Sequence, residues 1–289
     1  MQLERIITMA SGSVRLPFLA MERSLRATGC DLPLWVIPYN EERFDLPPNA
    51  TWWEIPEVSA WLDREIPNQH RFVKRKYQCL LTDNFQFVDA DVIFLRNPTD
   101  VLRDVEGWVL SCTHWSNPAQ TTTAASRKIM QRENTTWPQR IFNTGQFASD
   151  RALYDFTRLQ KISSEVAHRD TILSDRFHEQ PGINLLVFLA GIETTNLTLP
   201  PHRMESTWAG DYREPDFRRT WSPPDRCPYL IHWAGLDSDQ SLPINALMHQ
   251  FLTASERDEW LEHCHVKAAK NRPNPVRNFL WKVRETFRS

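Results

Sequence analysis

The chain has 289 residues, of which 41% are hydrophobic and 24% charged, so it has the composition of an ordinary globular protein with material for a sizeable core. Its formal net charge is −2, which gives no reason to expect nucleic acid as a partner. Only 8 residues are glycine and no two lie closer than nine positions, which excludes the Walker A loop and the dinucleotide-binding fingerprint, because both need closely spaced glycines.

The N-terminal part of the chain predicts a strand over 4–9, a helix over 15–28 and a second strand over 32–39. The strands are rich in β-branched residues, and the helix carries apolar residues at helical spacing and ends before Gly29. A strand, a helix and a strand at this length form a βαβ unit, which favours a parallel sheet. A third strand is predicted over 51–56.

The middle of the chain predicts a basic helical segment over 69–82 and a strand over 85–95 that is apolar on both faces apart from two aspartates. Such continuous apolar runs are typical of a central strand that helices cover on both sides. An irregular segment rich in Pro and Trp, 200–228, is expected to be a folded loop. The remaining predicted elements are strands at 108–112, 141–148 and 227–235 and helices near 121–132, 151–160, 182–190, 243–253 and 255–266.

Cysteine usage and hydropathy predict the compartment. The five cysteines are widely spaced and include no C-x-x-C pair, which favours reduced thiols. The N-terminal residues have no continuous apolar segment of the kind found in signal peptides, and no stretch approaches the length of a membrane-spanning helix. We therefore expect a cytoplasmic protein.

The strongest chemical signal is the pair Asp89 and Asp91 within the apolar strand. At positions i and i+2 of a strand, two carboxylates face the same side. Burying unpaired carboxylates is costly, so we expect them at a strand end, facing a cation or water. Hard oxygen ligands suit Mg²⁺ or Mn²⁺ beside a substrate phosphate. A polar turn that ends an edge strand is the alternative interpretation.

Four motifs follow one another along the chain: FVDADVIFLRNP (87–98), FNTGQFASD (142–150), EQPGINLLV (179–187) and IHWAG (231–235). This succession resembles the GT-A glycosyltransferases, whose α/β fold is a Rossmann-like mixed sheet with helices on both faces. It is most similar to the retaining families that use galactose or glucose nucleotides and carry D-x-D, F-N-[ST]-G, D-Q-x-x-x-N and a C-terminal H-x-x-G. The resemblance spans about residues 4–250.

The resemblance implies a metal site. Asp89 and Asp91 would hold Mn²⁺ (or Mg²⁺) against the donor diphosphate, and His232 would supply a third ligand. Neutral imidazole is an acceptable ligand for such a cation. Without the motif, a core histidine with a hydrogen bond at a strand end would be the simpler interpretation of His232.

The resemblance also implies catalytic and donor-binding residues. Asn143 would reach the transferred sugar, and Gln180 would lie on the sugar face where a nucleophile or ion-pair stabiliser acts. Glu179 stands where the family has Asp, which puts its role in doubt, and Asn184 is expected to be a structural amide. The implied donor-binding residues are Thr8, Ala10 and Ser11 at the end of the first strand, Lys76, Asp89, and the two motif glycines Gly145 and Gly235.

One departure from the family concerns positive charge. The family has a Lys soon after H-x-x-G, whereas no Lys or Arg follows Gly235 until Arg257. Positive charge for the diphosphate must then come from elsewhere, and the candidates are Arg71, Lys74, Arg75 and Lys76. At most two of these can face inward from a helix. Lys76 is the first choice and Arg75 the second.

The implied function is a metal-dependent glycosyltransferase that moves a hexose from a UDP-sugar to a saccharide or lipid-linked hydroxyl, with retention. An inverting enzyme would need a carboxylate base, for which Asp150, Glu179 and Asp211 are candidates. One alternative is a sugar-nucleotide nucleotidyltransferase, whose glycine-rich N-terminal loop the sequence MASGSVRLP matches poorly. Another is a non-catalytic carbohydrate-binding protein, which the 12 tryptophans fit but which leaves the acid–histidine set without a purpose.

Residues 1–265 are expected to form the GT-A domain and 266–289 a basic C-terminal tail with seven Lys or Arg and one Glu. From Pro275 onward, apolar residues line one face of a predicted helix, although Trp281 falls on the basic side. This pattern fits a helix on an anionic membrane surface, or a terminal helix packed on the domain. Membrane binding would make the protein peripheral on the inner face of the membrane and favour a glycolipid acceptor.

Overall fold

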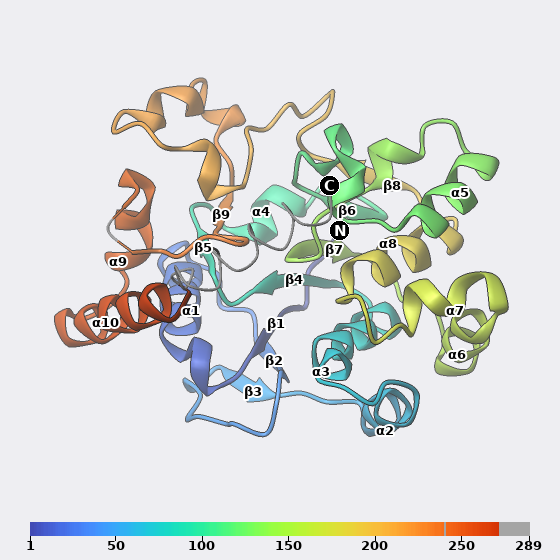
Figure 1. The fold of residues 1–289 in the computed structure, drawn as a ribbon. Coiled ribbons are helices and arrows are strands. Elements are labelled where there is room, and N and C mark those ends of the chain that lie inside the picture. The colour runs from blue at the N-terminus through green and yellow to red at the C-terminus, as the bar shows by residue number, and fades with distance from the viewer. Residues whose placement is uncertain (240, 272–289) are drawn as a thin grey trace, which may run out of the picture.

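The computed structural model describes residues 1–239 and 241–271. It confirms the α/β class: a seven-stranded mixed sheet in the order β3-β2-β1-β4-β7-β6-β8 lies between helices, and β5 and β9 form a second, two-stranded sheet (Figure 1). The strands are β1 (Arg5–Ala10), β2 (Leu34–Pro38), β3 (Ala50–Trp52), β4 (Phe85–Asp89), β5 (Val92–Phe94), β6 (Trp108–Leu110), β7 (Gln146–Ser149), β8 (Thr194–Asn196) and β9 (Leu230–His232). The helices are α1 (Arg15–Ala27), α2 (Pro56–Glu65), α3 (His70–Lys74), α4 (Pro98–Leu102), α5 (Ala124–Glu133), α6 (Phe156–Ser164), α7 (Val166–Ile172), α8 (Gln180–Leu189), α9 (Ala246–His249) and α10 (Ala254–Asn271).

The sheet topology brings the ends of several strands to one edge of the sheet. Strands β3, β2, β1 and β4 are parallel, and β7 runs antiparallel to β4. Met9 pairs with Asp89, and Val88 pairs with Gln146. The carboxyl ends of β1 and β4 therefore meet the first residue of β7. In open α/β sheets, ligands bind beyond the carboxyl ends of parallel strands.

The core lies on both faces of the large sheet, because successive strand residues point to opposite sides. Ile7 and Met9 of β1 pack with residues of α2, α6, α7 and α8 on one face. Ile6 and Ala10 pack with α1 and α4 on the other. Helices thus cover both faces, as a buried parallel strand requires (Figure 1).

The predicted single strand over 85–95 is wrong. The chain turns at Ala90 and Asp91, so the segment divides into β4, in the large sheet, and β5, which pairs antiparallel with β9. Both halves are apolar, and the turn contains no Gly or Pro, so it is marked only by the aspartates, which the alternative interpretation assigned to a polar turn. Asp89 is therefore the last residue of β4 and Asp91 lies in the turn, so the two aspartates do not alternate along one strand.

Other differences are local. The predicted strand over 141–148 begins only at Gln146, and the sequence reading missed α2, α4, α7 and β8. The segment 200–228 is a folded loop, as predicted, with short 3-10 turns and buried aromatic side chains.

Helix α10 continues through the predicted boundary after residue 265 to Asn271. The rest of the predicted tail, 272–289, lies outside the described residues. Within 1–239 and 241–271, no helix combines the length and the apolar character needed to cross a membrane.

Candidate active site

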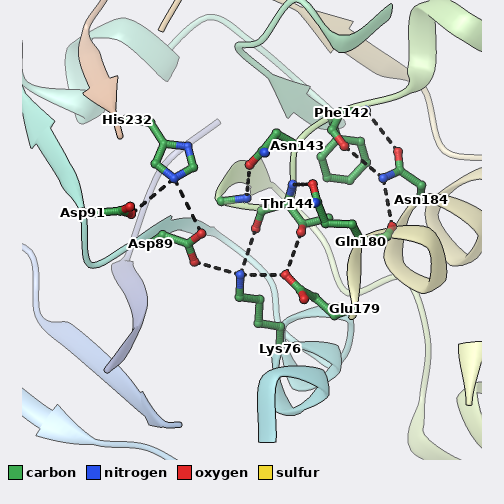
Figure 2. A network of polar contacts seen from close by, with 11 residues as sticks. Lys76, Asp89, Asp91, Phe142, Asn143, Thr144, Glu179, Gln180, Asn184 and His232 are labelled. Carbon is green, nitrogen blue, oxygen red and sulfur yellow. Dashed lines mark hydrogen bonds and ion pairs between the residues drawn. The ribbon is translucent and has the colours of Figure 1, made fainter. Parts of the chain in front are cut away.

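Asp89, Asp91 and His232 converge at the carboxyl edge of the sheet. His232 Nε2 lies 3.3 Å from Asp91 Oδ1 and 3.7 Å from Asp89 Oδ2 (Figure 2). One potential ligand atom from each residue lies within 4.8 Å of the others, and no second such group of acids, histidines or cysteines occurs in the part of the chain that the structure describes. The antiparallel pairing of Val92 with His232 creates this convergence, since it places the end of β9 beside the turn between β4 and β5.

Gly145 allows the His232 ring to lie against the backbone. A Cβ atom at Gly145 would lie 2.1 Å from His232 Cε1 and 2.6 Å from Asp89 Oδ2, far inside normal contact distance. The histidine is buried, and its backbone N–H donates to the carbonyl of Thr207 at 2.7 Å. The imidazole is therefore fixed in place, and only glycine fits beneath it.

Lys76 joins the cluster to the start of α8. Its Nζ donates to Asp89 Oδ1 at 2.8 Å and to Glu179 Oε1 at 2.9 Å, and Thr144 Oγ1 donates to the same Glu179 oxygen at 2.9 Å. Lys76 and Glu179 are both buried. Burial opposes the charged form of each group. The carboxylates of Asp89 and Glu179 outweigh it at Lys76 and raise that pKa above its ordinary value, and the Lys76 ammonium outweighs it at Glu179 and lowers that pKa. Both are therefore charged.

Asp91 and His232 attract each other in the same way. Burial lowers the pKa of His232, but the charge and hydrogen bond of Asp91 outweigh it and raise this pKa above its ordinary value. Burial alone would raise the pKa of Asp91, but the His232 imidazole outweighs burial, so this pKa lies below its ordinary value. Asp91 thus favours a positive charge at this point, which a proton on the imidazole or a metal ion can supply.

The F-N-T-G segment is a loop that Asn184 holds against α8. Asn184 accepts from the Phe142 N–H at 3.0 Å and donates to the Phe142 carbonyl at 2.9 Å. Asn143 Oδ1 accepts from the Gly145 N–H at 2.8 Å, and Gln180 Oε1 accepts from the Thr144 N–H at 3.3 Å (Figure 2). Asn143, Glu179 and Gln180 are therefore brought beside the acid–histidine cluster.

The basic segment before β4 differs from expectation. Lys74, Arg75 and Lys76 are all buried, whereas at most two of the four candidate cations were expected to face inward. The α-helix changes to a 3-10 helix at Arg75, so the three side chains point in different directions. Lys74 donates to the carbonyls of Ile172 and Ser174, and burial lowers its pKa to about 8. Arg75 donates to the Pro38 carbonyl, so only Lys76 reaches the acidic cluster.

A cleft of about 490 Å³ opens beside the cluster. Its walls include the predicted residues Ser11, Lys76, Asp89, Asp91 and Glu179. The predicted Thr8 and Ala10 are fully buried and do not line it. Gly235, with φ +70°, sits in the turn between two residues that do line it, Trp233 and Leu236.

Helix α10 contributes to this cleft, which was not predicted from the sequence. Trp260 and Lys267 line it, and Lys267 Nζ lies 2.5 Å from Oδ1 of Asp237, which also lines it. Trp260 Nε1 donates to Ser238 Oγ at 3.0 Å, which anchors the helix there. The predicted helix ended at residue 266, and Lys267 was counted among the basic residues of the separate tail.

The order of strands, the acid pair at the end of β4 and the histidine at the end of β9 agree with the GT-A fold that the motifs implied. The sequence matches no protein-family model and no curated protein. Among solved structures, the chain resembles WbbM, a bifunctional glycosyltransferase, with a TM-score of 0.54 and 10% identity over 91% of this chain and 52% of that one. It also resembles the galactosyltransferase LgtC, solved with donor and acceptor sugar analogues, with a TM-score of 0.51 and 14% identity over 90% of this chain and 99% of that one.

The likeness to these structures shows the fold and confirms the expectation of a GT-A sheet. The chain spans about half of the length of WbbM and nearly all of LgtC. At such identities, activity and substrates must be argued from the site itself.

Proposed function

We propose that this chain is a metal-dependent glycosyltransferase that moves a hexose from a UDP-sugar to a hydroxyl group of a saccharide or lipid-linked acceptor, with retention. The observation that carries the proposal is the convergence of Asp89, Asp91 and His232 on the carboxyl edge of a GT-A sheet. The adjoining cleft of about 490 Å³ has the size of a small-molecule site.

The residues of the cluster fit a divalent cation. Two carboxylates and one imidazole supply oxygen and nitrogen ligands and leave positions free for diphosphate oxygens, as Mn²⁺ or Mg²⁺ requires. When bound, such a cation neutralises the charge that develops on a diphosphate leaving group. Lys76 orients Asp89 for this role, because it holds Oδ1 while Oδ2 faces His232.

The cleft also carries the positive charge that residues 236–256 lack. Among the described residues that line it, Lys76 and Lys267 are the two Lys or Arg side chains. Lys76 is neutralised by two carboxylates, whereas the Lys267 side chain is 52% exposed and has one carboxylate partner. Lys267 is therefore the side chain that we assign to the donor diphosphate.

Asp150 and Glu179, two of the three candidate bases for an inverting reaction, are held in ion pairs, whereas Asp211 is exposed. Asp150 follows β7 at the end opposite to Asp89, because Ser149 pairs with Phe85, and it forms an ion pair with Arg151. Glu179 is held by Lys76. Two of the three candidate bases for an inverting reaction are thus engaged elsewhere. In a retaining reaction an oxygen of the departing diphosphate can accept the acceptor's proton, so no such base is needed.

Asn143 and Gln180 are the polar side chains that we assign to the transferred sugar. Each uses its side-chain oxygen to accept a backbone N–H of the 142–145 loop. This leaves both amide NH₂ groups as donors for hydroxyl groups of a sugar. Glu179 acts as a positioning residue through Lys76 and Thr144.

A thermal-shift panel tests the proposal. UDP-glucose, UDP-galactose and GDP-mannose are added to the wild type and to Asp91→Asn, each with Mn²⁺ or with EDTA. We expect a uridine nucleotide to stabilise the wild type only with Mn²⁺, by about 2.7 kcal/mol when its concentration is about 100 times its Kd. Asp91→Asn should lose this shift, and Asp225→Asn, on an exposed turn, should keep it. The proposal fails if no nucleotide sugar stabilises the wild type.

A further inference from the structure

Trp208 presents an aromatic surface beside the acid–histidine cluster. Its side chain is 37% exposed. The other Phe, Tyr and Trp side chains that the structure describes are buried or half-buried. Its backbone forms a parallel bridge with His232. Trp208 therefore lies one strand spacing, about 4.8 Å, from the backbone of a proposed metal ligand.

The Trp208 ring is held in one orientation. Its Nε1–H donates to the Ala234 carbonyl at 3.0 Å, which fixes the edge of the indole. A Cβ atom at Gly210 would lie 2.4 Å from a carbon of the six-membered ring, so the ring lies directly on this glycine. One face of the indole is thus covered by backbone, and the other faces solvent.

The loop that carries Trp208 is packed, so its exposure does not result from a loose segment. Ala209, Tyr212, Phe217 and Trp221 are buried in one apolar cluster with residues of β5, β9 and α9. The ring centroids of Tyr212 and Trp221 lie 5.5 Å apart, and those of Phe217 and Trp221 lie 5.1 Å apart, both edge to face. This aromatic cluster is a rigid base for one outward-facing indole.

We propose that the free face of Trp208 is the platform on which a pyranose ring of the acceptor stacks; this inference rests on the proposed function and names the class of its second substrate. The donor cleft extends from Asp89 and Asp91 to Ser11 and α10, and Trp208 is not part of its lining. A ligand that reaches both the cluster and Trp208 therefore extends beyond the donor cleft.

The chemistry of the two surfaces is complementary. One face of a pyranose consists largely of C–H groups, which match the electron-rich face of an indole, while its hydroxyl groups stay at the edge for hydrogen bonds. A fixed aromatic ring loses little conformational freedom on binding. Asp211, exposed in the same 3-10 turn, supplies a hydrogen-bond acceptor near this surface.

Saturation-transfer NMR tests this inference. The probes are the methyl glycosides of glucose, galactose, mannose and N-acetylglucosamine, with UDP and diamagnetic Mg²⁺ present to fill the donor cleft. We expect at least one glycoside to receive saturation on its ring C–H protons from the wild type. Trp208→Ala should weaken its Kd about tenfold, as removal of one stacking platform does. Trp208→Phe keeps a flat face and should stay within about threefold, as should Val166→Ala, which removes an exposed apolar side chain on α7.

The inference is overturned if every glycoside binds Trp208→Ala as it binds the wild type, or if none binds the wild type while UDP does. Calorimetric titration of UDP on the same samples separates the two proposals. Glycoside binding that depends on Trp208 without any binding of UDP would support the platform and contradict the transferase. If the wild type binds neither UDP nor any glycoside, both the proposed function and the stacking platform are contradicted.

Discussion

Gly145 offers the sharpest perturbation of the proposed metal site. In Gly145→Ala the new Cβ would lie 2.1 Å from His232 Cε1, whereas ordinary contact begins at 3.4 Å. The ring would have to move by about 1.3 Å, and it has little room, because His232 is buried and its backbone is bound to Thr207. Asp89 Oδ2, at 2.6 Å from the same Cβ, would be displaced as well.

Two of three proposed ligands are thus pushed out of position by one methyl group. Disturbing the residues that orient metal ligands costs roughly 10- to 100-fold in metal affinity, and we expect a loss of that size in Gly145→Ala. Titration with Mn²⁺, followed by the EPR signal of the free ion, measures it directly. Circular dichroism melting of the same protein checks that the fold is retained.

Gly12→Ala is the matched control for this experiment. Gly12 lies between two cleft residues, and a Cβ there would meet only Glu42, at 3.7 Å. It should bind Mn²⁺ as the wild type does. Equal Mn²⁺ affinity in Gly145→Ala and the wild type would refute the placement of His232 and Asp89 around a cation.

Three further predictions concern charged side chains. Lys76→Met leaves the buried Glu179 and the half-buried Asp89 without their cation, so its free energy of unfolding in urea should fall by about 3–5 kcal/mol. Lys267→Ala removes an exposed pair and should change stability by less than about 1 kcal/mol, while its Kd for UDP with Mn²⁺, measured by calorimetry, rises several-fold. The hydrogen bond from Arg23 lowers the pKa of Glu256 to about 2, so its stabilising contribution is complete above its ordinary value of 4.5 and is lost as pH falls toward 2. Glu256→Gln should therefore have a lower melting temperature than the wild type at neutral pH. The two melting temperatures should converge as the pH falls from 4.5 toward 2.

Each of these has a clear contrary result. A Lys76→Met protein as stable as the wild type would show that the buried bridge contributes no stability. Unchanged affinity of Lys267→Ala for UDP would remove α10 from the donor site. A difference in melting temperature between Glu256→Gln and the wild type that stays constant with pH would show that the Arg23 pair does not depress the Glu256 pKa.

The sequence predicted the parts of the fold whose signals are local. The βαβ unit at the N-terminus was found from β-branched strands and an amphipathic helix, and β1, α1 and β2 lie within a few residues of their predicted bounds. The division of 85–95 into β4 and β5 could not be found in this way. It is set by which partner each half pairs with, β1 and β7 for one and β9 for the other, and both halves have the same apolar pattern.

In the candidate site, too, residues within local motifs were predicted, and a residue placed by helix docking was not. The motifs identified Asp89, Asp91 and His232, which the fold brings together, and Asn184 as a structural amide. Lys267 escaped notice, because its place in the cleft follows from how α10 docks, through Trp260 and through the Arg23–Glu256 pair with α1. No local pattern encodes that docking.

The release of UDP from UDP-hexoses tests the central claim most directly. The wild type is incubated with UDP-glucose and UDP-galactose, with Mn²⁺ or EDTA, and free UDP is followed over time. The account predicts release with at least one donor in Mn²⁺ and none in EDTA, and loss of that release in Asp91→Asn. Release that proceeds equally in EDTA, or that survives in Asp91→Asn, would contradict a cation held by Asp89, Asp91 and His232.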